Sequence, residues 1–139
     1  MNKEEIDKKI SDLWDEIHEL QDQKLQIELE GTPELEGKYL KIEDDFDWTV
    51  YMYCYENFPS GPDMVIRGLG FTWEVTPYWD ATSMRSSWGY DIIKKKIDYP
   101  KFVKDKITFI TKEEFIEKYK TMVNEYSNKF DEIIKEHCN

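Results

Sequence analysis

Apolar side chains recur at alternating steps of four and three residues along the N-terminal part of the chain. They are Ile6, Ile10, Leu13, Ile17, Leu20 and Ile27. This spacing predicts a helix with a narrow apolar seam of the kind that packs in coiled coils, and Lys24 is the polar break in it. Asn2 and Glu5 match a capping box at the start, and Gly31 supplies a stop. We therefore expect a coiled-coil-like helix over residues 1–31.

Between residues 37 and 110 the pattern changes to alternation with a period of two, which is typical of strands. The expected strands cover residues 38–42, 48–56, 64–76, 88–93 and 106–110. We expect loops at 57–63 and 77–87 from their turn-forming residues. An irregular stretch is expected at 94–105, around Pro100.

The strand expected at 48–56 carries large side chains on both faces. Met52 and Cys54 face one way, whereas Tyr51 and Tyr53 face the other. This pattern predicts either a central strand covered on both sides or a strand with a tyrosine-lined functional face. Cys54 is then expected in the core as a small strand residue.

The strand expected at 64–76 contains two glycines, Gly68 and Gly70. It also places one charged residue, Arg67, on an otherwise apolar face. Glycine inside a strand indicates a bulge, a tight bend or a close approach of another backbone. A long strand bent at glycines is also how small barrels turn corners.

The chain from residue 111 to 137 has the spacing of a second helix. Thr111 and Glu114 match a capping box, and Ile110 and Phe115 occupy the two positions of a hydrophobic staple. The apolar stripe consists of Phe115, Tyr119, Met122, Val123, Tyr126, Phe130, Ile133 and Ile134. A stripe this broad predicts packing on a sheet or between several elements.

Together these patterns predict an α+β fold in a single domain, residues 1–139. Its centre, residues 37–110, is either a small antiparallel β-sheet or an SH3-like, partly open barrel of about five strands. The flanking helices at 1–31 and 111–137 could pair within one chain or build a homo-oligomer with other copies. The narrow seam of the first helix favours the homo-oligomer.

The chain of 139 residues carries a net charge of −11 that is concentrated near its start. Residues 1–36 hold 12 acidic and 4 basic side chains. This charge disfavours direct nucleic-acid binding and favours a basic protein partner. Solubility is the alternative explanation for the acidity. Aromatic residues make up 15% of the chain, which argues against disorder.

No apolar stretch resembles a signal peptide or reaches the ~18 residues that a membrane span needs. Neither Cys54 nor Cys138 has the spacing of a zinc site or of a disulfide framework. We therefore expect a reduced, cytoplasmic setting with no membrane association.

The sequence has no catalytic motif of specific spacing, so we expect no enzyme, no cofactor and no metal. His18 and His137 are expected at the surface. Asp44, Asp45 and Asp47 offer three carboxylates that could bind calcium or magnesium. A solvated turn explains these aspartates better, and a small metal-dependent hydrolase is kept as an alternative.

A candidate ligand site combines aromatic, hydroxyl and arginine side chains around the loop expected at 77–87. Its residues are Arg85, Trp79, Trp88, Tyr78, Ser83, Arg67 and Tyr53. Arginine and hydroxyl groups can hold a phosphate while aromatic rings stack on a base, so this set would suit a nucleotide-like ligand. The alternative is that the aromatic residues belong to the core and the loop is an ordinary connection.

A basic run follows this loop and opposes the N-terminal helix in charge. It consists of Lys94, Lys95, Lys96, Lys101, Lys104 and Lys106. These lysines could pair with the acidic helix, within one chain or across a dimer, or they could meet phosphate.

Two segments, residues 37–42 and 107–115, resemble the small Lys/Glu/Ile-rich accessory proteins encoded by phages and mobile elements of low-GC bacteria. They read Gly-Lys-Tyr-Leu-Lys-Ile and Ile-Thr-Phe-Ile-Thr-Lys-Glu-Glu-Phe. The resemblance implies an inhibitor of a host defence system that acts by occlusion or by sequestering a signal nucleotide.

The leading hypothesis is a non-enzymatic, phage-type inhibitor that occludes a host protein through an acidic, aromatic-rich surface. The partner-binding residues expected on the N-terminal helix are Asp12, Asp15, Glu16, Glu19 and Trp14. Charge steering combined with an exposed tryptophan is typical of binding surfaces. The alternative is a sponge that sequesters a phosphorylated nucleotide at the aromatic loop.

Overall fold

A computed structural model describes residues 1–44, 49–76 and 81–138, with the backbone alone at 73–76, 81–85 and 137. Its elements run in the order helix, four strands, helix, strand, helix. They are α1 (Lys3–Glu30), β1 (Tyr39–Glu43), β2 (Thr49–Ser60), β3 (Asp63–Thr76), β4 (Ala81–Lys95), α2 (Tyr99–Lys106), β5 (Ile107–Ile110) and α3 (Lys112–His137).

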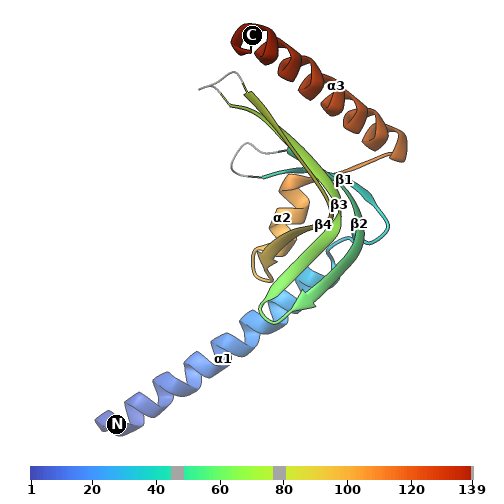
Figure 1. Ribbon diagram of the computed structural model, residues 1–139. Helices are drawn as coiled ribbons and strands as arrows, with labels where there is room; N and C mark the ends of the chain where they lie inside the picture. Colours follow the sequence, from blue (N-terminus) through green and yellow to red (C-terminus); the bar gives the residue numbers. More distant parts are fainter. Residues whose placement is uncertain (45–48, 77–80, 139) are drawn as a thin grey trace.

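The strands form one antiparallel sheet with the order β4-β3-β2-β1-β5 (Figure 1). The sheet is open, with β4 and β5 at its two edges. The expectation of an α+β fold with an antiparallel sheet between two terminal helices is therefore confirmed. The chain does not adopt the barrel alternative, because the edge strands β4 and β5 do not pair with each other.

Strand β2 lies in the middle of the sheet and is covered on both faces. On one face, Met52 and Cys54 pack in a core with residues of α2 such as Phe102. On the other face, Tyr51 packs in a second core with Phe115 of α3. The expectation of a central strand covered on both sides is thus confirmed, and the two cores fix α2 and α3 on opposite faces of the sheet.

Gly68 and Gly70 allow close approach inside the sheet, which is one of the alternatives that their position in the sequence predicts. The β3–β4 register shifts between these two residues. A Cβ at Gly68 would clash with the carbonyl oxygen of Tyr53 on β2. A Cβ at Gly70 would lie 2.9 Å from the Cβ of Tyr90 on β4. Both glycines therefore make room for neighbouring strands.

Three expectations about connections were wrong. Residues 57–63 do not form a loop: β2 and β3 continue until Ser60 pairs with Asp63, and a tight turn at Gly61 joins them with φ of +58°. The stretch at 94–105 is not irregular, because α2 occupies most of it with a proline in its first turn. Such a proline is tolerated because the N–H it lacks would have no helical partner there. The 77–87 loop is also shorter than expected, since β4 already begins at Ala81.

The two long helices begin where their capping residues predict. The side chain of Asn2 accepts a hydrogen bond from the backbone N–H of Glu5 at 2.8 Å. Thr111 Oγ1 accepts one from the N–H of Glu114 at 3.1 Å. The helices α1 and α3 lie at opposite ends of the molecule and do not pair within the chain (Figure 1). Among the described residues, no helix is long and apolar enough to cross a membrane.

Candidate functional site

Helix α1 leaves the body of the protein and projects away from the sheet (Figure 1). All of its residues are described, and none is buried. Its end next to the body is fixed because Leu29 packs against the core shared by the sheet and α2. Every residue of α1 from position 3 to position 24 is exposed to solvent.

The partner-binding residues expected from the sequence all lie on this projecting helix, and all are exposed. We call Asp12, Asp15, Glu16 and Glu19 the acidic face. In the described structure, none of these carboxylates forms a salt bridge. Residues 11–23 contain five acidic and no Lys or Arg side chains, so the field along this part of α1 is uniformly negative.

Trp14 does not belong to the acidic face. It is 55% exposed and its ring contacts that of His18, with centroids 6.2 Å apart. At about 3.6 residues per turn, Trp14 lies on the opposite flank of the helix from Glu16. A partner could therefore contact the tryptophan and the acidic face together only by wrapping around the helix.

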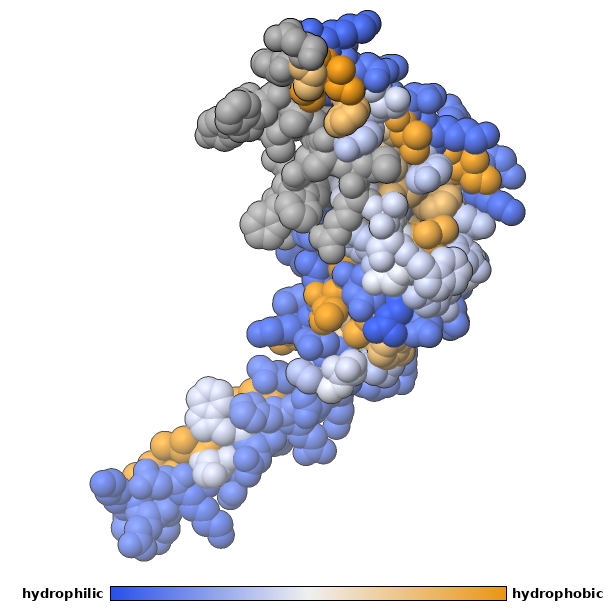
Figure 2. Space-filling view, in the orientation of Figure 1, coloured by the Kyte–Doolittle hydropathy of each residue, from blue (hydrophilic) through white to orange (hydrophobic). Residues whose placement is uncertain are grey.

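The apolar seam of α1 is also open to solvent. It comprises Ile6, Ile10, Leu13, Ile17, Leu20 and Ile27, whose exposed fractions lie between 41% and 70%. In Figure 2 the hydrophobic colour continues along the projecting helix, away from the body. Soluble proteins rarely leave such a continuous apolar stripe uncovered, so the seam indicates an association surface.

A second candidate site is a cleft of about 340 Å³ between α3 and strands β3 and β4, which we call the aromatic cleft. It is lined by Leu69, Gly70, Phe71, Ser86, Ser87, Trp88, Phe115, Ile116 and Tyr119. Phe71 and Tyr119 meet edge to face, with centroids 5.4 Å apart. The lining is mainly apolar, and the two serines add hydroxyl groups at one side.

Of the residues expected around a nucleotide-like ligand, Trp88 lies in the aromatic cleft, 65% exposed. Tyr53 lies next to this region but packs on Tyr39, with ring centroids 4.9 Å apart. Ser83 and Arg85 belong to strand β4 rather than to a loop, opposite residues 74 and 72 of β3. Tyr78 and Trp79 lie outside the described residues.

Arg67 does not line the aromatic cleft and is occupied by other groups. Its Nε donates to Asp91 at 2.7 Å, and its Nη1 donates to Glu56 at 3.2 Å. The guanidinium also lies over the ring of Phe58 at 5.3 Å. The hydrogen bond to Asp91 raises the pKa of Arg67. These contacts explain the charged residue on an apolar strand face, and they leave Arg67 as a link between β2, β3 and β4.

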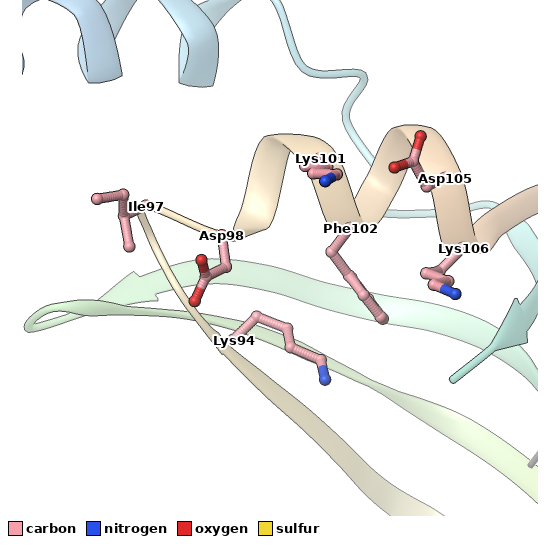
Figure 3. A pocket seen from close by; sticks show the side chains of 7 residues that line it. All are labelled: Lys94, Ile97, Asp98, Lys101, Phe102, Asp105 and Lys106. Atoms are coloured by element: carbon pink, nitrogen blue, oxygen red, sulfur yellow. The ribbon is translucent and has the colours of Figure 1, made fainter. Parts of the chain in front are cut away.

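Three lysines of the basic run, Lys94, Lys101 and Lys106, line a cleft of about 540 Å³ between the end of β4 and α2. Figure 3 shows its lining, which is Lys94, Ile97, Asp98, Lys101, Phe102, Asp105 and Lys106. Lys94 forms an ion pair with Asp44 at 3.5 Å, and its ammonium lies 4.7 Å from the ring centre of Phe102. Asp98 and Asp105 also line the cleft, so its charge is mixed.

Cys54 lies in the core, as expected. It is fully buried, and its Sγ donates a hydrogen bond to the carbonyl of Glu56 at 3.3 Å. Burial raises the pKa of this thiol to about 11, so the neutral form prevails at neutral pH. The thiolate is the nucleophilic form of cysteine, so this environment disfavours a nucleophilic role for Cys54.

No cluster of three or more metal-ligating side chains occurs among the residues that the structure describes. Asp45 and Asp47, two members of the acidic turn, lie outside those residues. The third, Asp44, is the partner of Lys94.

Sequence reasoning missed the aromatic cleft as a site, because it depends on two segments far apart in the chain. Phe115 and Tyr119 of α3 were expected in a buried stripe, whereas both also line the cleft. Their spacing predicted an apolar face, but it carried no information on which strands that face would meet. Comparisons of the chain with family models, with curated proteins and with solved structures found no match.

Proposed function

We propose that the protein is a non-enzymatic binding protein that engages a basic partner through the acidic face of α1. The observation that carries this proposal is the exposure of the whole acidic face on a helix that projects from the body. At ~1.5 Å per residue, the 28 residues of α1 extend about 42 Å. The face can therefore meet a partner without steric conflict with the sheet.

The uniform sign of charge along residues 11–23 supports attraction of a positively charged surface. Opposite potentials speed encounter and oppose wrong partners, and their effect weakens as salt rises. Trp14 adds a large exposed ring of the type that dominates binding energy at interfaces. Trp14 and the acidic face lie on different sides of α1, which favours a partner that contacts the helix on both sides.

The resemblance to phage accessory proteins suggests the partner class. A host defence protein that handles nucleic acid carries a basic surface, and an acidic helix bound there would occlude the nucleic acid. Inhibition by occlusion needs no catalytic group on the inhibitor. We include this host-protein partner in the proposal.

The proposal can be tested with a variant in which Asp12→Asn, Asp15→Asn, Glu16→Gln and Glu19→Gln remove the acidic face. The partner is first recovered by affinity capture on the wild-type protein at low salt and identified. The neutralised variant should bind that partner about tenfold to a hundredfold more weakly, because several charge pairs of modest strength are lost.

A matched control neutralises four exposed carboxylates on α3 with Glu113→Gln, Glu117→Gln, Glu125→Gln and Asp131→Asn. It changes the net charge by the same amount and leaves α1 intact, so its affinity should remain near that of the wild type. Equal affinity of the α1 variant and the wild type would overturn the proposal. Capture of no basic protein by the wild type would overturn it as well.

The aromatic cleft favours a second candidate function, the sequestration of a small molecule with a planar aromatic ring. Its size, its apolar lining and the exposed ring of Trp88 support this function. Arg67 is held by two carboxylates elsewhere, so a phosphate on the ligand would depend on other groups.

Calorimetric titration with adenine and with adenosine monophosphate tests this second candidate. Trp88→Ala should abolish the heat of binding, whereas Trp14→Ala, which removes a tryptophan outside the cleft, should leave it unchanged. Tighter binding of the monophosphate than of adenine would support the nucleotide-sponge alternative. No heat with either compound would remove the candidate.

A further inference from the structure

We infer that α1 pairs with α1 of a second copy as a parallel, two-stranded coiled coil. The inference goes beyond the proposed function, because it concerns the apolar seam and not the acidic face. Its basis is a 28-residue helix that has no buried residue although six apolar side chains share one stripe. Helices in proteins obtain most of their stability from packing such a stripe, which the described part of this chain does not provide.

The seam has the heptad arrangement of a two-stranded coil. With Ile6 at position d, the central a positions are Ile10 and Ile17, and the central d positions are Leu13 and Leu20. β-Branched residues at a together with leucine at d favour two parallel strands over three or four. The central two heptads therefore favour a pair of helices over a larger bundle.

The side chains that flank the seam are compatible with the same arrangement. In a parallel pair, position g of one helix meets position e of the next heptad on its partner. Here Lys9, Glu16 and Gln23 of one helix lie next to Trp14, Gln21 and Glu28 of the other, respectively. None of these pairs joins two like charges, and the first places an ammonium next to an indole ring.

Lys24 is the polar residue in the interior of the seam, since Lys3 lies at the helix start, and it also favours the parallel register. A polar residue at an a position fixes register and strand number at some loss of stability. In a parallel pair the two copies of Lys24 share one layer, from which both side chains can reach solvent. In an antiparallel pair with full overlap, each Lys24 would instead face the apolar layer around Ile10 of the other helix.

The attachment of α1 to the body leaves room for this pair. Leu29, which packs against the core, occupies position f, on the far side of the helix from the seam. Two helices joined through their seams would therefore carry their bodies on the outside. The acidic face occupies positions c, f and g, so the dimer would expose it twice.

Native mass spectrometry and light scattering of the full chain test the inference. The wild type should have twice the 16.8 kDa mass of one chain. The double variant Leu13→Asp and Leu20→Asp should be monomeric, with dimer affinity reduced more than about a hundredfold. The control, Ser11→Asp and His18→Asp, adds the same charge with the same spacing at position b and should remain dimeric.

Cross-linking tests the direction of the helices in a background with Cys138→Ser. Lys24→Cys should give a covalent dimer on oxidation, since only a parallel pair brings two copies of residue 24 together. Asp22→Cys, on the outer side of the helix, should not. The remaining Cys54 is buried and therefore does not react.

A dimer that is lost in the seam variant and cross-links at residue 24 supports the inference. A monomeric wild type at micromolar concentration overturns it, as does a trimer or tetramer. A dimer that fails to cross-link at residue 24 overturns the parallel arrangement. A monomer that still binds the basic partner through its acidic face would overturn this inference alone and leave the proposed function intact.

Discussion

The indole ring of Trp88 on β4 stacks on the phenol ring of Tyr55 on β2, with centroids 5.0 Å apart and an interplanar angle of 16°. Strand β3 lies between these two strands in the sheet. The pair therefore reaches across three strands on the surface, and it holds one wall of the aromatic cleft in place although Trp88 is largely exposed.

A double-mutant cycle with Trp88→Ala and Tyr55→Ala should measure this stacking contact. We expect a coupling free energy of about 0.5–1.5 kcal/mol in urea unfolding, the usual range for aromatic pairs. A cycle that combines Tyr55→Ala with Trp14→Ala should give a coupling near zero, because Trp14 lies on the projecting helix. Equal coupling in the two cycles would contradict the contact.

Gly68→Ala should destabilise the sheet by about 3 kcal/mol or more. The added methyl group would overlap the carbonyl oxygen of Tyr53, a backbone atom that cannot move without displacing β2. Gly89→Ala is the control, since a Cβ at Gly89 meets no atom within 4 Å and should change stability by less than about 0.5 kcal/mol. Chemical denaturation of both variants is the measurement, and similar midpoints would contradict the close approach.

The side chain of Asn57 joins three segments by hydrogen bonds, and its loss should weaken the contacts among all three. Its Oδ1 accepts from the Tyr99 hydroxyl at 3.1 Å and from the Leu35 N–H at 3.4 Å, while Nδ2 donates to the Val65 carbonyl at 3.1 Å. Asn57→Ala leaves these groups without their partner and should cost about 3 kcal/mol of unfolding free energy.

Tyr99→Phe removes one member of the Asn57 network and serves as the milder comparison. It should cost about 1 kcal/mol, since a single hydrogen bond is lost while the ring stays packed. Thermal unfolding followed by circular dichroism would rank the two variants. A larger effect for Tyr99→Phe than for Asn57→Ala would show that the network is not organised around Asn57.

Alkaline pH should destabilise the protein through Cys54. Burial raises the pKa of this thiol in the folded state from its ordinary 9.0 to about 11. The unfolded chain therefore loses the proton first, so the contribution to stability is complete below pH 9 and is lost as the pH rises to 11. The free energy of unfolding should fall by about 1 kcal/mol between pH 8 and pH 10 from this group alone.

Cys54→Ala isolates the thiol from the other groups that titrate in the same range, including Tyr99, whose pKa is also raised by burial. The difference in unfolding free energy between wild type and variant should shrink as the pH rises from 8 to 10. A constant difference across this range would show that the thiol titrates normally in the folded protein.

The sequence determined local structure wherever the signal lies in neighbouring residues, as hydrophobic periodicity and helix capping do. The seam spacing and the pair Asn2 and Glu5 predicted α1, and alternation at 48–56 predicted a strand covered on both faces. The glycines of β3 marked close approaches for the same reason, Gly68 to Tyr53 and Gly70 to Tyr90, since only glycine lacks the atom that would clash.

Only the tertiary structure decided what each apolar face meets. The stretch around Pro100 has weak local signals, and it becomes a helix because Phe102 and Val103 can be buried against the sheet. Strands β2 and β3 extend as far as the turn at Gly61 because they stay paired to their ends. Such choices depend on residues far apart in sequence, which no short pattern contains.

The candidate sites follow the same division. The acidic face and the seam of α1 could be predicted, because their charge and spacing depend on residues of one continuous segment. Their exposure depends on where Leu29 anchors the helix to the body. Arg67 was expected near a ligand, but the sheet brings Glu56 and Asp91 to it from two other strands. The order of strands, set by burial of both sheet faces at once, decides which charged groups meet and which remain open to a partner.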